Sequence, residues 1–439
     1  MAVTHFTHAE LQQRNYALMG LARGLEGLLW MIVLCFFSGA IIGLTFADAT
    51  ALDQSDGAFG RMLWYPVYAG IFALAVFRLP RLMQLAAYSP ILIVCVLWCG
   101  ITYFWSVDPG GTLRRSIALL MTTFAGLAFA ARFDWAEMVE RIAGVMLVLA
   151  AITLFVVLTN PTRGIMQEIH PGAWRGPWVE KNYLGGVMTK GLAACLCAFA
   201  VRPSRAWLWV PGGLLCFALV LLSTSKTSLL ISLSIIGLFF VLRVFRRYPV
   251  LRVPVVFALV ASIAGIVGVI ALDAEWALSL IGKDPTLTGR TDIWTLLSRA
   301  ISLKPWFGYG YGIFWMDPLG PSYETRSVLQ WAVPTAHNGW FDAWLSGGAV
   351  VIALFLAVLI PTLLISFARI KSGGVETYWV VLSLFFFIGF SLSESSILQQ
   401  NDLSWFLFVA TTVKLWAREP AWWRPGSRGP VAKFTIARN

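Results

Sequence analysis

Apolar runs of about 20 residues recur along the chain from one end to the other, and they constrain its fold more than any other feature. A run of this length crosses the roughly 30 Å hydrocarbon core of a bilayer as an α-helix. The sequence therefore predicts an all-α, polytopic membrane protein in which residues 1–439 form a single integral membrane domain.

Apolar residues make up 58% of the 439 residues and charged residues only 13%, which excludes a water-soluble enzyme. The formal net charge of +11 is compatible with nucleic-acid binding, but Lys and Arg are spread over short loops between apolar runs. Membrane topology explains this distribution, so we expect no nucleic-acid partner. All six Cys lie inside apolar runs and are expected to be packing residues rather than disulfide or zinc ligands.

A hydropathy window of about 19 residues predicts about twelve spans. They cover residues 25–46, 62–77, 86–105, 116–131, 138–158, 183–201, 207–222, 228–245, 253–272, 346–367, 378–392 and 403–415. With both termini in the cytoplasm, 20 of the 33 Lys and Arg fall on the cytoplasmic side, as the positive-inside rule requires. Residues 416–439 are then a cytoplasmic tail.

The first apolar run follows Arg14 and Arg23 and ends at Ala47-Asp48-Ala49, which imitates a signal-peptidase site. The run is longer than the roughly 7–15 apolar residues of a signal peptide. Its removal would also place the two termini on opposite sides of the membrane. We therefore expect the first span to be retained.

Two outward loops are long, residues 159–182 and residues 273–338. A long loop in a compact protein is either functional or disordered, and the many Trp, Tyr and Phe residues of the second loop argue against disorder. Apolar residues at helical spacing predict an amphipathic helix over 292–302.

His337 is the sharpest candidate for a catalytic residue. It stands where the second long loop re-enters an apolar helix, in Ala336-His337-Asn338-Gly339. An imidazole suits a general base for a hydroxyl nucleophile near neutral pH. The alternative is a helix-entry residue with a satisfied hydrogen bond. The other three histidines, His5, His8 and His170, are expected to be solvated.

Two cations before the predicted span 183–201 run against the positive-inside trend. Arg175 and Lys181 lie on the outward side and need either a local partner or an anionic ligand. An ion pair with Glu180 or contact with lipid phosphates is the alternative to a ligand-binding role.

Two further cations lie downstream on the outward side. Lys226 is in a polar turn between two apolar spans, and a Lys at membrane depth is a functional candidate because its burial is costly. The turn lacks the glycines of a phosphate loop, which excludes nucleotide binding. Arg290 precedes the predicted amphipathic helix and suits a phosphate, with a surface ion pair such as Arg290–Asp292 as the alternative.

Residues 305–312 alternate aromatic residues with glycine, which favours a tight interfacial turn over a sugar or lipid path. The outward side has no D-x-D pair, H-E-x-x-H motif or His/Cys cluster, so neither a metal nor another cofactor is expected. Arg and Lys would then have to neutralise a departing phosphate.

Together these motifs resemble the bacterial O-antigen ligase and O-antigen polymerase superfamily. The resemblance is carried by Glu180-Lys181-Asn182-Tyr183-Leu184-Gly185, Ser225-Lys226-Thr227, Gly289-Arg290-Thr291-Asp292-Ile293-Trp294, residues 305–312 and Ala336-His337-Asn338-Gly339. It implies a GT-C-like glycosyltransferase in the bacterial inner membrane, with both termini cytoplasmic and the two long loops and the active site facing the periplasm.

The resemblance further implies ligation of O-antigen polysaccharide from undecaprenyl diphosphate onto lipid A-core in lipopolysaccharide biosynthesis. The reaction would be metal-independent and inverting, with His337 as the base. Arg290 and Arg175 would engage the donor diphosphate, with Lys181 and Lys226 as supporting positions. The implied partners are the lipid-linked glycan donor, the lipid A-core acceptor and membrane lipids.

An O-antigen or exopolysaccharide polymerase shares these motifs and is an alternative. A transporter of lipid-linked glycan, with Lys226 and Arg290 in its path, is a second alternative from another class. Transporters tend to show internal repeats and broken helices, whereas the polar residues here gather in outward loops. The distribution favours the glycosyltransferase.

Overall fold

A computed structural model describes residues 8–45, 58–168, 170–248, 250, 290–317, 319–330, 333–374 and 376–417. These residues form helices joined by loops. Ile165 and Trp174 make an isolated antiparallel bridge, and no strand occurs within the described ranges. The prediction of an all-α fold is confirmed.

The helices follow the predicted spans. In chain order they are α1 (His8–Phe37), α2 (Ala40–Thr45), α4 (Ala58–Val76), α5 (Leu79–Tyr88), α6 (Pro90–Ile101), η1 (Thr102–Trp105), α7 (Pro109–Arg132), α8 (Trp135–Thr159), α9 (Pro161–Gly164), α10 (Lys181–Val201), η2 (Pro203–Arg205), α11 (Ala206–Leu222), α12 (Lys226–Arg247), α15 (Arg290–Leu303), α16 (Tyr323–Leu329), α17 (Gly339–Ser372), α18 (Glu376–Ser391) and α19 (Leu403–Trp416). The predicted span 253–272 lies outside the described residues, as does most of the predicted tail 416–439. The predicted amphipathic helix 292–302 is α15, which buries Ile293 and Leu297.

Six of the described helices are long and apolar enough to cross a membrane: α7, α8, α10, α11 together with η2, α12 and α17. The number rises to seven if α4 and α5, which meet at a bend of 97°, count as one span. These helices indicate a multi-pass membrane protein. The predicted number of about twelve is not reached, because several apolar runs form shorter helices, among them α6, α18 and α19.

The first apolar run is shortened by a break that the sequence analysis did not foresee. Helix α1 ends at Phe37, and Gly39 adopts a φ of 75°, in the left-handed region that favours glycine. The Ser38 hydroxyl donates to the Cys35 carbonyl at 2.7 Å, which satisfies one of the last carbonyl groups of the helix. The chain then resumes as α2.

Helix starts carry the expected capping residues. The Asp134 carboxylate accepts from the Glu137 backbone N–H at 2.7 Å, and the Glu137 carboxylate accepts in return from Asp134 at 3.5 Å, which forms a capping box at α8. At α7, Asp108 accepts from Gly111 at 3.0 Å and Pro109 occupies the first turn.

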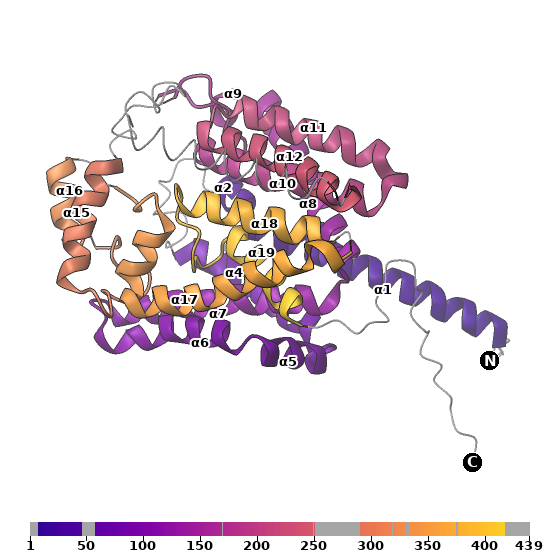
Figure 1. Ribbon diagram of the computed structural model, residues 1–439, viewed down its shortest axis with the longest axis horizontal. Coiled ribbons are helices and arrows are strands. Elements are labelled where there is room, and N and C mark those ends of the chain that lie inside the picture. The colour runs from indigo at the N-terminus through magenta and orange to yellow at the C-terminus, as the bar shows by residue number, and fades with distance from the viewer. Residues whose placement is uncertain are drawn as a thin grey trace, which may run out of the picture.

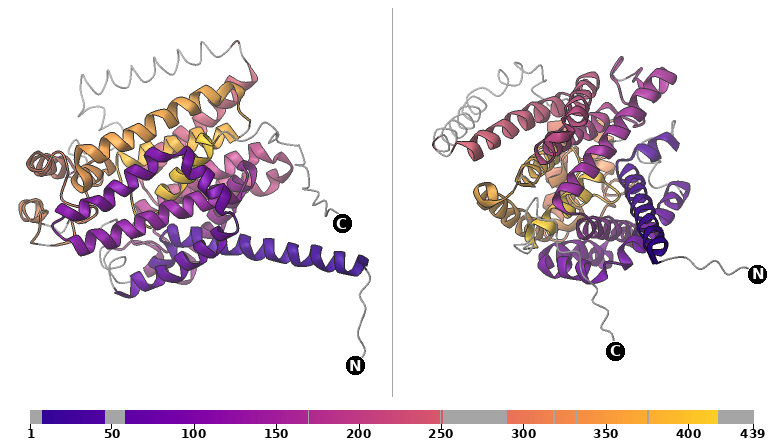
Figure 2. Two further views of the ribbon diagram at one scale, coloured as in Figure 1. Left: turned by 90° about the horizontal axis from the view of Figure 1, so that it is seen from below. Right: turned by 90° about the vertical axis from the view of Figure 1, so that its right-hand side faces the viewer.

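The helices form three groups that are visible in Figures 1 and 2. Helices α10, α11 and α12 lie on one side, α4 to α7 lie on the other, and α17, α18 and α19 run between them. Helices α15 and α16 stand at one end of the bundle, and α1 projects beyond the other helices at the opposite end.

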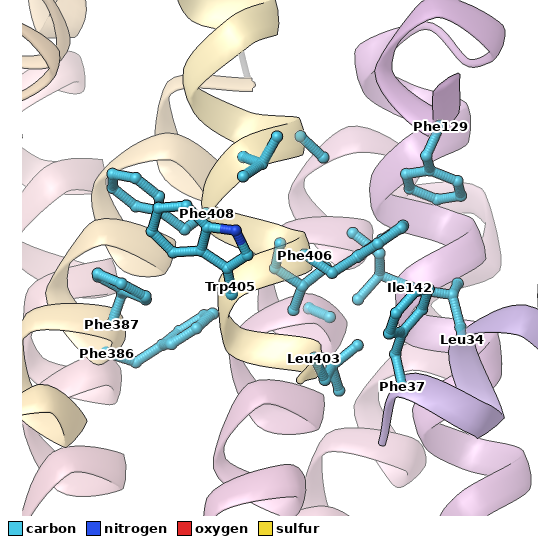
Figure 3. Packing of buried hydrophobic residues seen from close by; sticks show 14 of the residues in the cluster. Leu34, Phe37, Phe129, Ile142, Phe386, Phe387, Leu403, Trp405, Phe406 and Phe408 are labelled. Carbon is cyan, nitrogen blue, oxygen red and sulfur yellow. The ribbon is translucent and has the colours of Figure 1, made fainter. Parts of the chain in front are cut away.

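Helix α19 is the centre of the core. Every residue from Leu403 to Leu415 is buried. Phe408 stacks on Phe387 with ring centroids 4.4 Å apart, and the Trp405 indole N–H donates to the Thr123 hydroxyl at 3.0 Å (Figure 3). Because lipid is as apolar as the core, helices in a bilayer associate through such close packing and interhelical hydrogen bonds.

Basic residues predicted to face the cytoplasm form ion pairs that join several helices. Glu26 of α1 binds Arg78 and Arg132, each at 2.7 Å. Glu140 binds Arg202 at 2.9 Å. These contacts hold together the helix ends that the charge distribution assigned to one side, while the orientation of that side in a membrane stays a prediction.

Helix α17 is broken near its start at Gly348, which has φ 69° and ψ −167°. The segment 305–312 fills the break. The Ala349 N–H donates to the Pro305 carbonyl at 2.8 Å, and the Tyr309 N–H donates to the Leu345 carbonyl at 2.8 Å. The segment thus provides hydrogen-bond partners for backbone groups that the break in α17 leaves without a partner inside the helix. The prediction of a tight structural turn is confirmed.

We predict that Gly348→Ala destabilises the protein by about 2 kcal/mol or more, because its φ and ψ lie in a region that is essentially restricted to glycine. An added Cβ would also collide with the backbone of Trp306 and Phe307. Thermal unfolding in detergent should show a lower Tm. Gly70→Ala in α4 is the control, since nothing lies within 4 Å of a Cβ there. An unchanged Tm in Gly348→Ala would contradict the prediction.

Candidate active site

A cavity of about 520 Å³ opens among the three groups of helices. Its walls come from α4, α7, α10, the segment 311–316 and the connection between α18 and α19. His337 lines it. Of the five predicted site residues, His337 alone belongs to the residues that line this cavity.

The backbone around His337 is fixed by the start of α17. His337 itself has a φ of 46°, in the left-handed region that non-glycine residues rarely adopt. Asn338 caps the helix, with its side-chain oxygen accepting from Trp340 N–H at 2.9 Å. A strained residue beside a helix start is a recurrent feature of functional sites.

Asp342, in the first turn of α17, holds the loop that carries His337. Its carboxylate accepts from the Trp315 indole at 2.8 Å, from the Ala336 backbone N–H at 3.3 Å and from the Ser395 hydroxyl. These contacts join α17, the loop before it and the α18–α19 connection. They leave the loop little freedom to move the imidazole.

Glu394 brings two predicted residues together. One of its oxygens, Oε2, lies 3.6 Å from His337 Nδ1, and the other, Oε1, lies 3.6 Å from Arg290 Nη2. The three side chains are partly buried, with 17%, 19% and 32% exposure for His337, Arg290 and Glu394. Arg290 therefore forms an ion pair, as the alternative interpretation allowed, but its partner is Glu394 and not Asp292.

Glu180 completes this charged group, which we call the His337 cluster: Glu180, Arg290, His337 and Glu394. Glu180 precedes α10 and lines the cavity. Burial, followed by the nearby Glu394 carboxylate, raises the pKa of Glu180, while His337 and Arg290 oppose that shift. Two carboxylates and two basic groups thus interact at one end of the cavity.

Lys181 and Lys226 lie beside each other at the starts of α10 and α12. The Lys181 ammonium donates to the Thr224 hydroxyl at 3.5 Å, and the Lys226 charge acts on it. The Ser225 hydroxyl donates to the Asn182 side-chain oxygen at 3.0 Å. Two motifs that are distant in the sequence therefore meet here and concentrate positive charge.

Arg175 is placed differently. Its guanidinium donates to the carbonyl oxygens of Arg163 at 2.7 Å, Val179 at 3.3 Å and Thr162 at 3.4 Å. These bonds hold the loop that leads into α10. A role in binding diphosphate stays a prediction for Arg175.

Lys190 of α10 is a cavity residue that the sequence analysis missed. It is only 6% exposed, its ammonium donates to the Gly186 carbonyl at 3.3 Å and lies 4.9 Å from the centre of the Phe390 ring. The charge of Asp402 also acts on it. Burial raises the pKa of Asp402, and Lys190 opposes that shift. The two groups thus compensate each other electrostatically.

The sequence analysis also missed Glu394 and three cavity arginines, Arg61, Arg114 and Arg115. Glu394 lies in Ser393-Glu394-Ser395-Ser396, an acidic polar break between two apolar spans. This polar break in the apolar pattern could have been used to predict Glu394 as a candidate site residue. The arginines follow outward helix starts and were masked by the many other outward cations.

The described residues contain no group of three or more His, Cys, Asp or Glu side chains that could hold a metal ion. The six cysteines are buried free thiols, as predicted. Whether the reaction proceeds without metal stays a prediction.

Comparison with known proteins shows a family to which part of this chain is similar. The family described as O-Antigen ligase matches residues 211–356. Over this segment the chain is similar to the O-antigen ligase family. The predicted resemblance is confirmed. The matched segment contains Lys226, Arg290 and His337, whereas Glu394 lies outside it.

A curated relative extends the similarity to most of the chain. The chain is 28% identical over 346 residues to the "Exopolysaccharide production protein ExoQ" of Rhizobium meliloti (strain 1021). The alignment covers 75% of this chain and 77% of the relative. Both comparisons indicate a function of the O-antigen ligase and polymerase type.

We predict that Glu180→Gln changes how stability depends on pH. A carboxyl group whose pKa is raised on folding binds more protons in the folded state, so its contribution to stability falls as pH rises from its ordinary value of about 4.3 through the raised value. Glu180→Gln removes that loss. The Tm of the variant should exceed that of the parent near pH 7, with the difference shrinking toward pH 4.

The solvent-exposed Glu168 provides the matched control. Glu168→Gln should follow the Tm profile of the parent protein at every pH in detergent. A Glu180→Gln profile parallel to that of the parent would show that burial does not act on this carboxyl group.

Proposed function

We propose that the protein ligates O-antigen polysaccharide from undecaprenyl diphosphate onto lipid A-core by an inverting, metal-independent glycosyl transfer. One observation carries the proposal. A histidine in the matched family segment lines a cavity, and its Nδ1 lies 3.6 Å from the carboxylate that also approaches Arg290. At this distance Nδ1 makes no hydrogen bond to Glu394, but the carboxylate is near enough to support a base electrostatically.

In the proposed step, a hydroxyl of the acceptor attacks the anomeric carbon of the donor. His337 takes the hydroxyl proton, a new glycosidic bond forms, and the bond between the anomeric carbon and the diphosphate oxygen breaks with both electrons going to the diphosphate. Glu394 faces Nδ1 and stabilises the imidazolium that results, while Nε2 receives the proton.

The leaving diphosphate gains negative charge, which the cations near the His337 cluster would stabilise. Arg290 opens α15, where the helix start adds unsatisfied N–H groups and a positive dipole end. Lys181 and Lys226 supply two further charges at the starts of α10 and α12. Preorganised groups of this kind act on charge that develops in the transition state.

A second candidate is an exopolysaccharide or O-antigen polymerase. The similarity to ExoQ over 346 residues favours it, since that relative is described as an exopolysaccharide production protein. The same site would then join two lipid-linked glycans. Broken helices are typical of transporters. Helix α17 is broken, and α4 and α5 meet at a bend of 97°, so the helices do not argue against the transporter alternative. The His337 cluster and the family match favour transfer chemistry instead.

The proposal is tested with purified full-length protein in nanodiscs, supplied with undecaprenyl-diphosphate glycan, lipid A-core and EDTA. The parent should transfer glycan in the presence of the chelator. His337→Ala should lower the rate by about 10²–10⁴, the usual contribution of a general base. His170→Ala is the control, since His170 lies in an outward loop and is exposed. Full activity in His337→Ala would remove the assigned base.

The same assay separates the two candidate functions. Replacing lipid A-core with a second lipid-linked repeat unit should abolish product formation if the protein is a ligase. Longer lipid-linked glycan as product would instead establish the polymerase.

For Glu394 we expect a smaller effect than for His337, because Glu394 acts through the imidazole. Glu394→Gln should lower kcat by about 10- to 100-fold, with the KM for donor changed less. Glu394→Asp keeps the carboxylate and should recover part of kcat. Equal losses in both variants, with unchanged Tm, would contradict an electrostatic role for this residue.

A further inference from the structure

A second cationic wall lines the cavity and has no part in the proposed step. Arg61 of α4 and Arg114 and Arg115 of α7 belong to it. The carboxyl groups that line the cavity come from other elements, namely the start of α10, helix α17 and the α18–α19 connection. They are Glu180, Asp342, Glu394 and Asp402. The three arginines therefore come from other helices than these carboxyl groups, whereas Lys190 of α10 and His337 lie on the same side as the carboxyl groups.

The two walls lie on different sides of the central helices. In Figure 1, α7 lies on one side of α18 and α19, and α10 and α12 lie on the other, while α4 packs against α7. Lys181 and Lys226, which would hold the donor diphosphate, begin α10 and α12. The arginine wall is thus separate from the cations assigned to the donor.

One face of α4 combines charge with aromatic rings. Arg61, Trp64, Tyr65 and Tyr68 follow the spacing i, i+3, i+4 and i+7, and all four line the cavity. Trp64 stacks on Tyr68 with ring centroids 5.8 Å apart, and the Tyr68 hydroxyl donates to the Asn401 side-chain oxygen at 2.7 Å. Rigid aromatic surfaces beside a few polar groups are typical of a small-molecule subsite.

One contact of the Arg115 guanidinium is made to a group that carries no charge. Its Nη2 lies 2.7 Å from the Met316 sulfur, and a thioether is a weak acceptor. This contact orients the guanidinium toward the segment 311–316 while adding no negative charge. A guanidinium presents a planar fork of donors that matches the two oxygens of a carboxylate or phosphate.

We propose that Arg61, Arg114 and Arg115 form a subsite for a carboxylate or phosphate group carried by the acceptor glycan, with the aromatic face of α4 against the adjoining sugar ring. This inference rests on the proposed function, because in-line inversion brings the acceptor to the face of the anomeric carbon opposite the diphosphate. The subsite makes the protein selective for acidic acceptors.

The first test measures binding to purified full-length protein in zwitterionic nanodiscs without donor. The probes are a labelled oligosaccharide that contains glucuronic acid and its carboxyl-reduced counterpart, which differ only in charge at one carbon. The parent should bind the acidic probe about tenfold more tightly than the reduced one. In Arg114→Gln/Arg115→Gln the ratio should fall below about threefold, while the reduced probe binds as before.

Two further variants show whether a loss of binding comes from misfolding or from the lost guanidinium groups. Arg115→Lys keeps the charge without the planar fork and should retain part of the preference. Arg299→Gln is the matched control, since Arg299 is 71% exposed and pairs with Glu324 on α15 and α16, away from the cavity wall. Equal loss of both probes in the double variant, or the same loss in Arg299→Gln, would overturn the subsite.

The second test determines whether the anionic group at these arginines belongs to the acceptor, the donor or a lipid headgroup. In the transfer assay the double variant should raise the KM for an acidic acceptor about tenfold and leave the KM for donor unchanged. A higher KM for donor would place the diphosphate at these arginines and overturn the inference. A preference that appears only in nanodiscs with anionic lipid would point to a headgroup and also overturn it.

Failure of the proposed function gives a different result. If the parent prefers the acidic probe but forms no glycosidic bond with any acceptor, the glycosyl transfer is wrong and the anionic glycan site stands. If the parent transfers glycan but binds both probes equally, the transfer stands and the subsite is wrong.

Discussion

The need to pair every backbone group inside the bundle governs how the cavity is built. The connection between α18 and α19 is irregular and partly buried, so water cannot satisfy all of its polar groups. The Tyr311 hydroxyl donates to the Leu398 carbonyl at 2.5 Å, and Asn401 N–H donates to the Thr122 hydroxyl at 2.8 Å. Partners from α7 and from the long outward loop thus fix this connection. Non-helical backbone at such depth is tolerated where it lines a cavity, and Glu394 lies on it.

Partial burial also explains why acidic and basic side chains lie together in the His337 cluster. Bringing carboxylates and basic groups out of water is costly unless they compensate one another. Glu180 and Glu394 repel each other, and Arg290 and His337 offset that repulsion. An anionic substrate that enters would compete for Arg290 and alter this balance. Perturbed titration at a cavity wall is a common property of catalytic sites.

The sequence predicted the fold class and part of the site for clear physical reasons. Apolar runs determine helices because the bilayer permits little else, and helical spacing revealed α15. His337 and Arg290 stood out because they interrupt or border apolar segments. Glu394 could not be linked to them from sequence, since about a hundred residues separate it from Arg290 and only the tertiary fold joins them. Arg175 shows a contact that the sequence does not reveal, because its guanidinium donates to carbonyl groups of its own loop, and its role in binding diphosphate stays a prediction.

The break at Gly348 divides α17 into two pieces with different structural roles. The longer piece is a membrane-depth rod packed among other helices, and the shorter piece is a stub that begins just after His337. Because the aromatic and glycine-rich segment 305–312 holds the joint, the direction of the stub is set by a loop and not by the long piece of the helix. Substitutions in the segment 305–312 can therefore change the orientation of the His337 imidazole without changing how the long piece of α17 packs against other helices. Such a joint lets one helical scaffold present His337 in different orientations.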